Sequence, residues 1–213
     1  MNRTEITNKI SEYVKSKQLG ETTGHDWWHT YRVWQTAKKI GQLEKADLFI
    51  VELAALLHDL DDWKFNNNND VAVSAKKLLE EYEVATEVID HVCEIIKDLS
   101  FKGVGVATPM KSIEGKVVQD ADRLDALGAI GIARAFTTGV TRGRVIYDPE
   151  SMMNERVENF KIKDSRSTIH HFYDKLFLLK DLMNTETAKS IAKERHEFME
   201  EFVREFLKEW DEE

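Results

Sequence analysis

The chain has 213 residues, of which 42% are hydrophobic and 32% charged, and it carries a net charge of −9. This balance is typical of a globular protein with its own core, and the acidic excess argues against non-specific binding of nucleic-acid polymers. No apolar run approaches the roughly 18 residues that a membrane span requires, and the polar N-terminal segment does not resemble a secretory signal. Cys93 is the only cysteine, which excludes an intramolecular disulfide. We therefore expect a cytoplasmic protein without a membrane anchor.

Helical periodicity runs through most of the chain, and only two prolines interrupt it. The spacing of apolar residues predicts a first helix capped by Thr4 or Thr7, and a long final helix capped by Thr185. No segment has the alternating pattern of a strand. The predicted helices cover residues 4–17, 27–44, 45–60, 71–82, 83–99, 112–139 and two segments of 167–210. The expected fold is all-α: one domain over residues 1–213, with a core at about 20–140 and a C-terminal helical extension at about 150–213.

The stretch GHDWWHTYRV, residues 24–33, holds the first group of candidate metal ligands. His25 and His29 are four residues apart, which places them on one face if the helix covers both. Gly24 indicates that His25 lies before or at the helix start, so the pattern favours His29 over His25 as a metal ligand. His25 and Asp26 are then candidates for capping or for positions beside the site.

The second group is the pair His58-Asp59 in LAALLHDLDDW, at the end of a strongly apolar segment. Burying a carboxylate without a partner is costly, so an aspartate at this position suggests that the carboxylate of Asp59 has a partner. At a helix terminus the chain can bend so that both side chains reach one ion. The alternative is that His58 meets the helix dipole while Asp59 is exposed in the following turn.

The third group is QDADRLDA, which contains Asp120, Asp122 and Asp125. Asp122 and Asp125 share a helix face at a spacing of three, whereas Asp120 lies on nearly the opposite side. A solvated acidic face is the alternative, but the small apolar residues around the motif favour a ligand helix within a packed bundle.

The order of these motifs, His29, then His58-Asp59, then Asp122, resembles the HD superfamily of metal-dependent phosphohydrolases. The words LAALLHDLDDWKF and VVQDADRLDALGAIGIARAF are similar to the small bacterial branch typified by YpgQ and YedJ. The resemblance covers nearly the whole chain and implies an HD-type helical bundle with additional C-terminal helices. It assigns the metal ligands to His29, His58, Asp59 and Asp122. Since only His91 lies between the HD pair and the last aspartate, we expect one divalent ion: Mn, Co, Ni, Fe, Zn or Mg.

An ion of this kind needs a group that positions the attacking water. Asp62, three residues after Asp59, is the candidate catalytic residue, because some HD phosphohydrolases have an acidic residue at this spacing. Asp61 and Asp26 are alternatives, and Asp61 and Asp62 could also simply open a loop.

Binding of phosphate also calls for cationic side chains. Arg32 lies one turn after His29, and Lys64 follows the HD loop. His171 and Lys175 are four residues apart in the C-terminal region, where they either contact substrate or form a surface pair. Further candidates, each with a structural alternative, are the loop arginines Arg142 and Arg144 and the aromatic residues Trp27, Trp28 and Trp63.

The expected activity is that of a metal-dependent phosphohydrolase acting on a nucleotide, with a nucleoside triphosphate and release of pyrophosphate as the finer hypothesis. A phosphodiesterase for cyclic nucleotides or other phosphoesters is the first alternative. A non-catalytic sensor of nucleotide or metal is the second. The expected partner is a small phosphate ester, not a membrane or a nucleic-acid polymer, and the sequence allows a homodimer.

Overall fold

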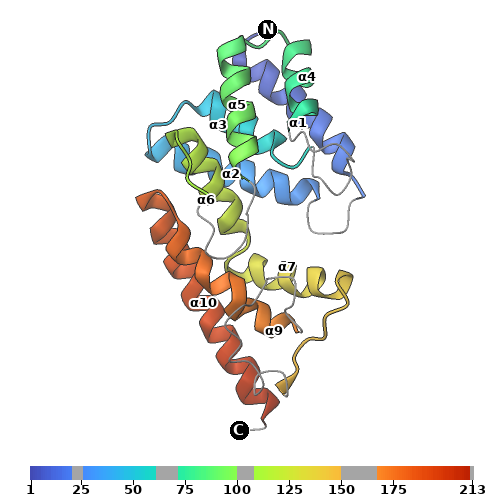
Figure 1. Cartoon of the computed structure of the whole chain (residues 1–213), viewed down its shortest axis with the longest axis vertical. Coiled ribbons are helices and arrows are strands. Elements are labelled where there is room, and N and C mark those ends of the chain that lie inside the picture. Colours follow the sequence, from blue (N-terminus) through green and yellow to red (C-terminus); the bar gives the residue numbers. More distant parts are fainter. Residues whose placement is uncertain (21–25, 61–71, 100–107, 150–166, 212–213) are drawn as a thin grey trace. The chain divides into compact units, whose positions relative to one another are not determined.

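The computed structural model describes residues 1–20, 26–60, 72–99, 108–149 and 167–211. Its regular structure is helical, and within these ranges the only β-type pairing is an isolated parallel bridge between Val145 and Ser167 (Figure 1). The all-α prediction is therefore confirmed. The helices are α1 (Arg3–Gln18), α2 (Trp27–Leu43), α3 (Leu48–Leu57), α4 (Val73–Glu81), α5 (Thr86–Leu99), α6 (Ile113–Asp125), α7 (Gly128–Thr141), α9 (Thr168–His171), the π-helix η2 (Phe172–Leu176), the 3₁₀-helix η3 (Phe177–Leu182) and α10 (Glu186–Trp210).

The chain folds into two compact units, with the division in α6 between Asp122 and Arg123. Among the described residues, the first unit contains 1–99 and 108–122, and the second contains 123–211. The division lies within the core that the sequence placed at about 20–140. The assignment of residues 1–213 to a single domain stays a prediction.

Helix α3 lies at the centre of the first unit, where it packs against α1, α2 and α5. Asp47 begins the helix by accepting a hydrogen bond from the backbone N–H of Phe49 at 2.9 Å. Leu53 and Leu56 are fully buried, and burial of each such side chain contributes about 1.5–3 kcal/mol. This buried helix ends at Leu57, so His58 is held at the end of the most apolar element of the unit.

The capping residue predicted for the first helix is wrong, and the cap of the last helix is confirmed. Asn2 caps α1, because its side chain accepts from the N–H of Glu5 while the Glu5 carboxylate accepts from the N–H of Asn2. Thr7 lies inside the helix and donates its hydroxyl to the carbonyl of Arg3 at 3.1 Å. At the other end of the chain, Thr185 accepts from the N–H of Ala188 at 3.2 Å.

The single helix predicted for residues 112–139 is also wrong, since α6 ends at Asp125 and α7 begins at Gly128. Gly128 has a φ of +72°, a left-handed conformation that glycine adopts at little cost. A Cβ at this position would lie 3.0 Å from Cγ of Arg195, so the site also lacks room for a side chain. The run of small residues around this break preserves helical periodicity on both sides, which is why the pattern reads as one helix.

In the second unit, α10 packs against α7 and η3, and α9 packs against α7. Aromatic rings fill the space between these elements; Phe172 stacks on Phe202, with ring centroids 6.1 Å apart. The segment from α9 to η3 passes from α-helical to π-helical and then to 3₁₀-helical turns. None of the helices that the structure describes combines the length and apolar character of a membrane span.

Candidate metal centre

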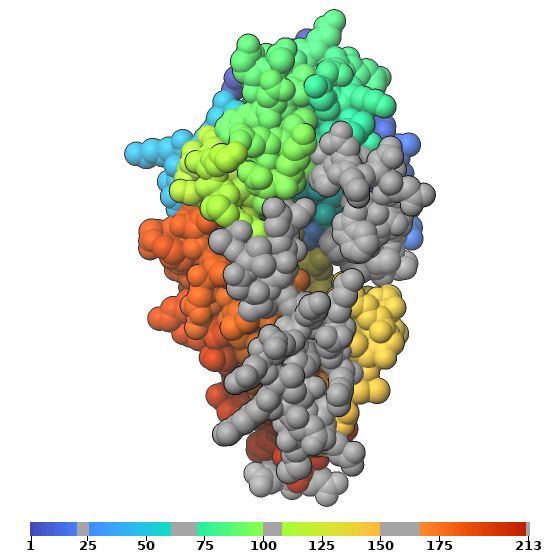
Figure 2. Space-filling view, viewed as in Figure 1, coloured from blue at the N-terminus to red at the C-terminus, as the bar shows by residue number. Residues whose placement is uncertain are grey.

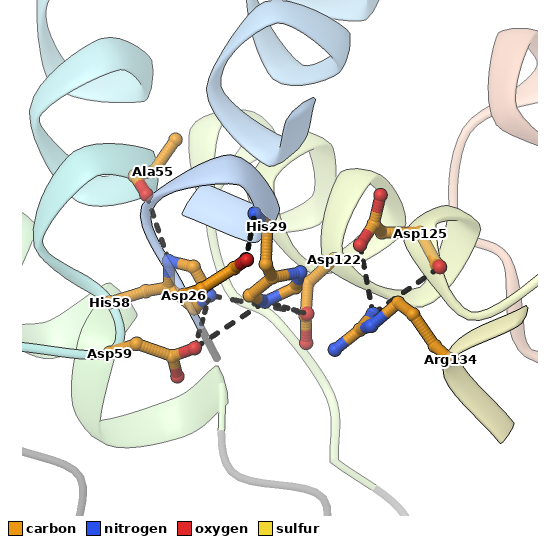
Figure 3. Close-up of polar contacts among 8 residues, drawn as sticks. All are labelled: Asp26, His29, Ala55, His58, Asp59, Asp122, Asp125 and Arg134. Carbon is orange, nitrogen blue, oxygen red and sulfur yellow. Dashed lines mark hydrogen bonds and ion pairs between the residues drawn. The ribbon is translucent and has the colours of Figure 1, made fainter. Parts of the chain in front are cut away.

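Two histidines and two aspartates converge in the first unit, on α2, α6 and the turn after α3 (Figure 3). Nε2 of His29 lies 3.4 Å from Oδ2 of Asp59 and 3.5 Å from Oδ1 of Asp122. Nε2 of His58 lies 3.3 Å and 4.0 Å from the same two oxygens. The ligand atoms of His29, His58 and Asp59 all lie within 4.8 Å of one another, as metal-binding groups do.

These separations fit a shared ion. Atoms that each lie 2.0–2.2 Å from one metal are about 3–3.5 Å apart, whereas a direct hydrogen bond would bring nitrogen and oxygen to about 2.9 Å. Most of the four nitrogen–oxygen distances fall in the first range. The donor set of imidazole nitrogen and carboxylate oxygen suits Mn, Fe, Co, Ni or Zn better than Mg, which prefers oxygen ligands.

The start of α2 positions His29. Asp26 is the N-cap of this helix, and its carboxylate accepts from the backbone N–H of His29 at 2.9 Å. The imidazole of His29 is 1% exposed, so it faces the interior and not the solvent. His25 precedes the helix and lies outside the described residues. The capping role considered for Asp26 is thus what the structure gives it.

The orientation of His58 follows from a main-chain contact. Its Nδ1 lies 2.8 Å from the carbonyl oxygen of Ala55 in the last turn of α3. A carbonyl can only accept, so Nδ1 carries the proton and donates it. In the neutral ring the lone pair is then on Nε2, which faces Asp59 and Asp122, and this is the tautomer that a metal requires. Contact between His58 and the end of α3, the alternative that the sequence offered to metal binding, is therefore compatible with His58 as a metal ligand.

The charges of the site favour a cation. Burial alone lowers the pKa of His58, but Asp59 and Asp122 outweigh this effect and raise it to about 9. The Ala55 carbonyl acts in the same direction. Two carboxylates close to a buried imidazole thus stabilise positive charge at this point, whether a proton or a metal ion supplies it.

The three aspartates of α6 have different surroundings. The carboxylate of Asp122 is 38% exposed and faces the two histidines. Asp120 is fully buried and is not part of the histidine group. Asp125, which shares a predicted face with Asp122, is paired with Arg134: Nη1 of the arginine donates to Oδ2 at 2.8 Å (Figure 3). The structure therefore brings Asp122 to the site, whereas Asp125 pairs with Arg134 within the second unit, to which both residues belong.

The other predicted site residues are not among the four side chains that converge at the centre. Arg32 is half-buried one turn after His29, and Trp27 is buried whereas Trp28 is 57% exposed. Nε2 of His91 lies 3.9 Å from Oε2 of Glu114, and His91 is not part of the metal-capable group of His29, His58 and Asp59. His171 and Lys175 belong to the second unit. Asp61, Asp62, Trp63 and Lys64 lie outside the described residues.

Two functional contacts were missed by sequence reasoning: the Ala55 carbonyl and the Arg134 partner of Asp125. The first is a main-chain group, which leaves no mark in the side-chain pattern. A charge complementary to Asp125 was visible at Arg134, but only the turn at Gly128 brings the two together.

An open hollow of about 940 Å³ lies along α4 and α5, whose surfaces are drawn in green in Figure 2. Both lysines and acidic residues line it, and Lys111 contacts Glu94 at 2.6 Å. None of the four candidate ligands lines this hollow, so it is separate from the metal centre.

Comparison with known proteins gives consistent similarities. A family model of the HD domain matches residues 27–127. The chain is 46% identical to Bacillus subtilis YpgQ over 193 residues, which are 90% of this chain and 87% of that protein. The crystal structure of Bacillus subtilis YpgQ in complex with ADP is similar with a TM-score of 0.76 at 42% identity, over 95% of this chain and 97% of the other. An HD-superfamily hydrolase from Bacillus thuringiensis has a TM-score of 0.79 at 41% identity, over the whole of both chains.

Proposed function

Because the chain belongs to the HD superfamily of metal-dependent phosphohydrolases, we propose that it hydrolyses a phosphate bond of a nucleotide at the centre formed by His29, His58, Asp59 and Asp122. The observation that carries this proposal is the convergence of two imidazole nitrogens and two carboxylates at 3.3–4.0 Å. A divalent ion held by these groups supplies Lewis-acid chemistry, which activates water and neutralises charge at the phosphorus centre.

The residues of the chain then hold and orient the reactants. His58, fixed by Ala55, presents Nε2 to the centre, and His29 does so from the first turns of α2. Asp62 is the residue proposed to position the attacking water. Arg32 is proposed to contact phosphate from one turn beyond His29. Lys64, His171 and Lys175 are further residues proposed to bind the substrate.

A nucleotide is the substrate class that the similarities favour. Bacillus subtilis YpgQ, 42% identical to this chain over 95% of its length, has been crystallised with ADP. We propose that this chain acts on nucleoside triphosphates with release of pyrophosphate, and that manganese is among the metals that support the reaction. The mixed nitrogen and oxygen donors favour a transition metal.

The test combines metal binding with a substrate screen. Metal-free protein is supplied in turn with Mn, Co, Ni, Fe, Zn or Mg and incubated with nucleoside triphosphates, diphosphates and cyclic nucleotides, and the products are separated by chromatography. We expect the Asp59→Asn and His58→Ala variants to lose bound metal and at least about 100-fold in turnover, since even contacts one shell beyond a metal are worth 10–100-fold.

His91→Gln is the matched control, because His91 is paired with Glu114 and is not part of the metal-capable group. Full turnover by Asp59→Asn would contradict the proposal. Hydrolysis of cyclic nucleotides alone would replace it with a phosphodiesterase, and tight nucleotide binding without turnover under any metal would indicate a sensor.

A further inference from the structure

Four side chains that can carry positive charge gather in the second unit, around the turn that ends α7 and the segment that begins with α9. Arg142 is the C-cap of α7, and Arg144 follows it after Gly143, whose φ is +69°. His171 is the last residue of α9, and Lys175 lies four residues further on in the π-helix η2. Helical segments of the π type are rare and often occur at functional sites.

Main-chain hydrogen bonds fix the arginine turn to the start of α9. The N–H of Thr168 donates to the carbonyl of Val145 at 2.9 Å, and the N–H of Ile169 donates to the carbonyl of Ile146 at 3.1 Å. Arg144 is held at its own end by an N–H bond to the carbonyl of Gly139 at 2.9 Å. The position of Arg144 relative to α9 is therefore set by the backbone.

Nδ1 of the His171 imidazole is buried and has no hydrogen-bond partner among the described residues. The residue is 8% exposed, and no protein group in the described part of the chain hydrogen-bonds its buried Nδ1. Leaving a buried polar atom unsatisfied is unfavourable, so such an atom in a native site calls for an explanation.

Within the part of the chain that the structure describes, the charged groups that shift the pKa of this imidazole are cationic. Burial lowers the pKa of His171 to about 3, and Arg144, Lys175 and Arg142 act in the same direction. Asp174 acts on the pKa of Arg144 in the opposite direction from burial and raises it. A neutral imidazole with a buried donor position, surrounded by cations, is an environment suited to a multiply charged oxyanion.

We propose that Arg142, Arg144, His171 and Lys175 form an oxyanion site in the second unit that binds phosphate groups. The identification of the ligand as phosphate rests on the proposed function, in which both the nucleotide and the released pyrophosphate carry such groups. Arginine binds phosphate oxygens in a bidentate manner, and the tautomer of His171 with hydrogen on Nδ1 adds a neutral donor.

The probe for this site is inorganic pyrophosphate, titrated calorimetrically into the full-length, metal-free protein at low ionic strength. We expect Arg144→Gln to weaken pyrophosphate binding at least about tenfold, because it removes a charge-assisted contact. Arg204→Gln, which removes an exposed arginine of α10, is the matched control and should change binding less than about twofold. A histidine NMR titration should also show that pyrophosphate raises the pKa of His171.

A second arm distinguishes the two sources of phosphate. If Arg144→Gln weakens ADP and pyrophosphate alike, the site takes the phosphates of a nucleotide; if it weakens pyrophosphate alone, the site takes free pyrophosphate. Unchanged pyrophosphate binding by Arg144→Gln, or no binding by the wild-type protein, would overturn the proposal.

His58→Ala separates this inference from the proposed function. That variant should lose hydrolysis and keep the Arg144-dependent binding of pyrophosphate. Should the wild-type protein hydrolyse no nucleotide and still bind pyrophosphate through Arg144, the oxyanion site would stand and the proposed function would fail.

Discussion

The carboxylate of Asp26 and the backbone N–H of His29 are joined by a 2.9 Å hydrogen bond, so the residue that begins α2 also fixes the first turn that carries a candidate metal ligand. The side chain of Asp26 is thereby engaged as a cap. The hydrogen bond gives Asp26, which lies close to the candidate metal centre, a structural role that can be tested separately from a catalytic one.

If Asp26 acts as a cap, Asp26→Asn should behave like the wild type, because asparagine is an equally good N-cap. We expect its turnover to stay within about threefold and its stability within about 0.5 kcal/mol, whereas Asp26→Ala should lose about 1 kcal/mol of unfolding free energy. Denaturant unfolding and nucleotide hydrolysis measure the two effects. A collapse of turnover in Asp26→Asn with unchanged stability would instead identify Asp26 as an acid or base in the reaction.

The environments of Asp122 and Asp125 predict opposite phenotypes for the same change. Asp125→Asn removes the carboxylate that Arg134 contacts at 2.8 Å in a largely buried pair, and should cost about 1–3 kcal/mol of stability. Asp122→Asn alters a half-exposed carboxylate and should cost less stability than Asp125→Asn, while losing metal affinity and turnover. Calorimetric metal titration and denaturant unfolding of both variants provide the comparison, and matching phenotypes would refute it.

Gly128 and Gly20 allow backbone strain to be separated from crowding. Both have positive φ, +72° and +92°, but a Cβ at Gly128 would meet the Arg195 stem at 3.0 Å, while a Cβ at Gly20 would meet no atom within 4 Å. We expect Gly20→Ala to cost about 1 kcal/mol from strain alone, and Gly128→Ala to cost about 2 kcal/mol or more. Equal unfolding free energies would mean that Arg195 moves aside without penalty.

His171 predicts acid sensitivity of the folded state. Its pKa falls from an ordinary value of 6.5 to about 3 in the folded protein, so the unfolded chain takes up a proton at a higher pH than the native one. The stability linked to His171 is intact above pH 6.5 and is lost as the pH falls toward 3; at pH 5 the loss is about 2 kcal/mol.

The check is denaturant unfolding of the wild type, His171→Gln and His91→Gln at pH 7 and pH 5. Between pH 7 and pH 5, the wild type and His91→Gln should each lose about 2 kcal/mol more unfolding free energy than His171→Gln does. An identical pH dependence in all three proteins would show that His171 is not the group responsible.

Periodicity predicted the helices well because one face of each packs into a core. The apolar segment that became α3 and the stretch from Trp27 that became α2 are clear examples. The ends of helices were harder, because they depend on single local contacts. Asn2 caps α1 in place of the predicted threonines, and the turn before Gly128 divides a segment whose small residues suit a helix throughout.

At the site, the resemblance to the HD superfamily assigned the metal ligands to His29, His58, Asp59 and Asp122, and the structure places these four side chains together. The sequence left open whether Asp125 joined them, because helix spacing alone gives it the same face as Asp122. Its pairing with Arg134 depends on the fold of the following turn, which no local pattern encodes.

The hydrogen bond from His58 to the carbonyl of Ala55 has a consequence for how the centre tolerates genetic change. The group that selects the histidine tautomer belongs to the main chain, so no single substitution at residue 55 can delete it while the helix persists. A side-chain carboxylate in this role could be lost through one codon change. The orientation of His58 is therefore maintained as long as the last turn of α3 stays folded. Substitutions at residue 55 are limited only by how well the new side chain packs.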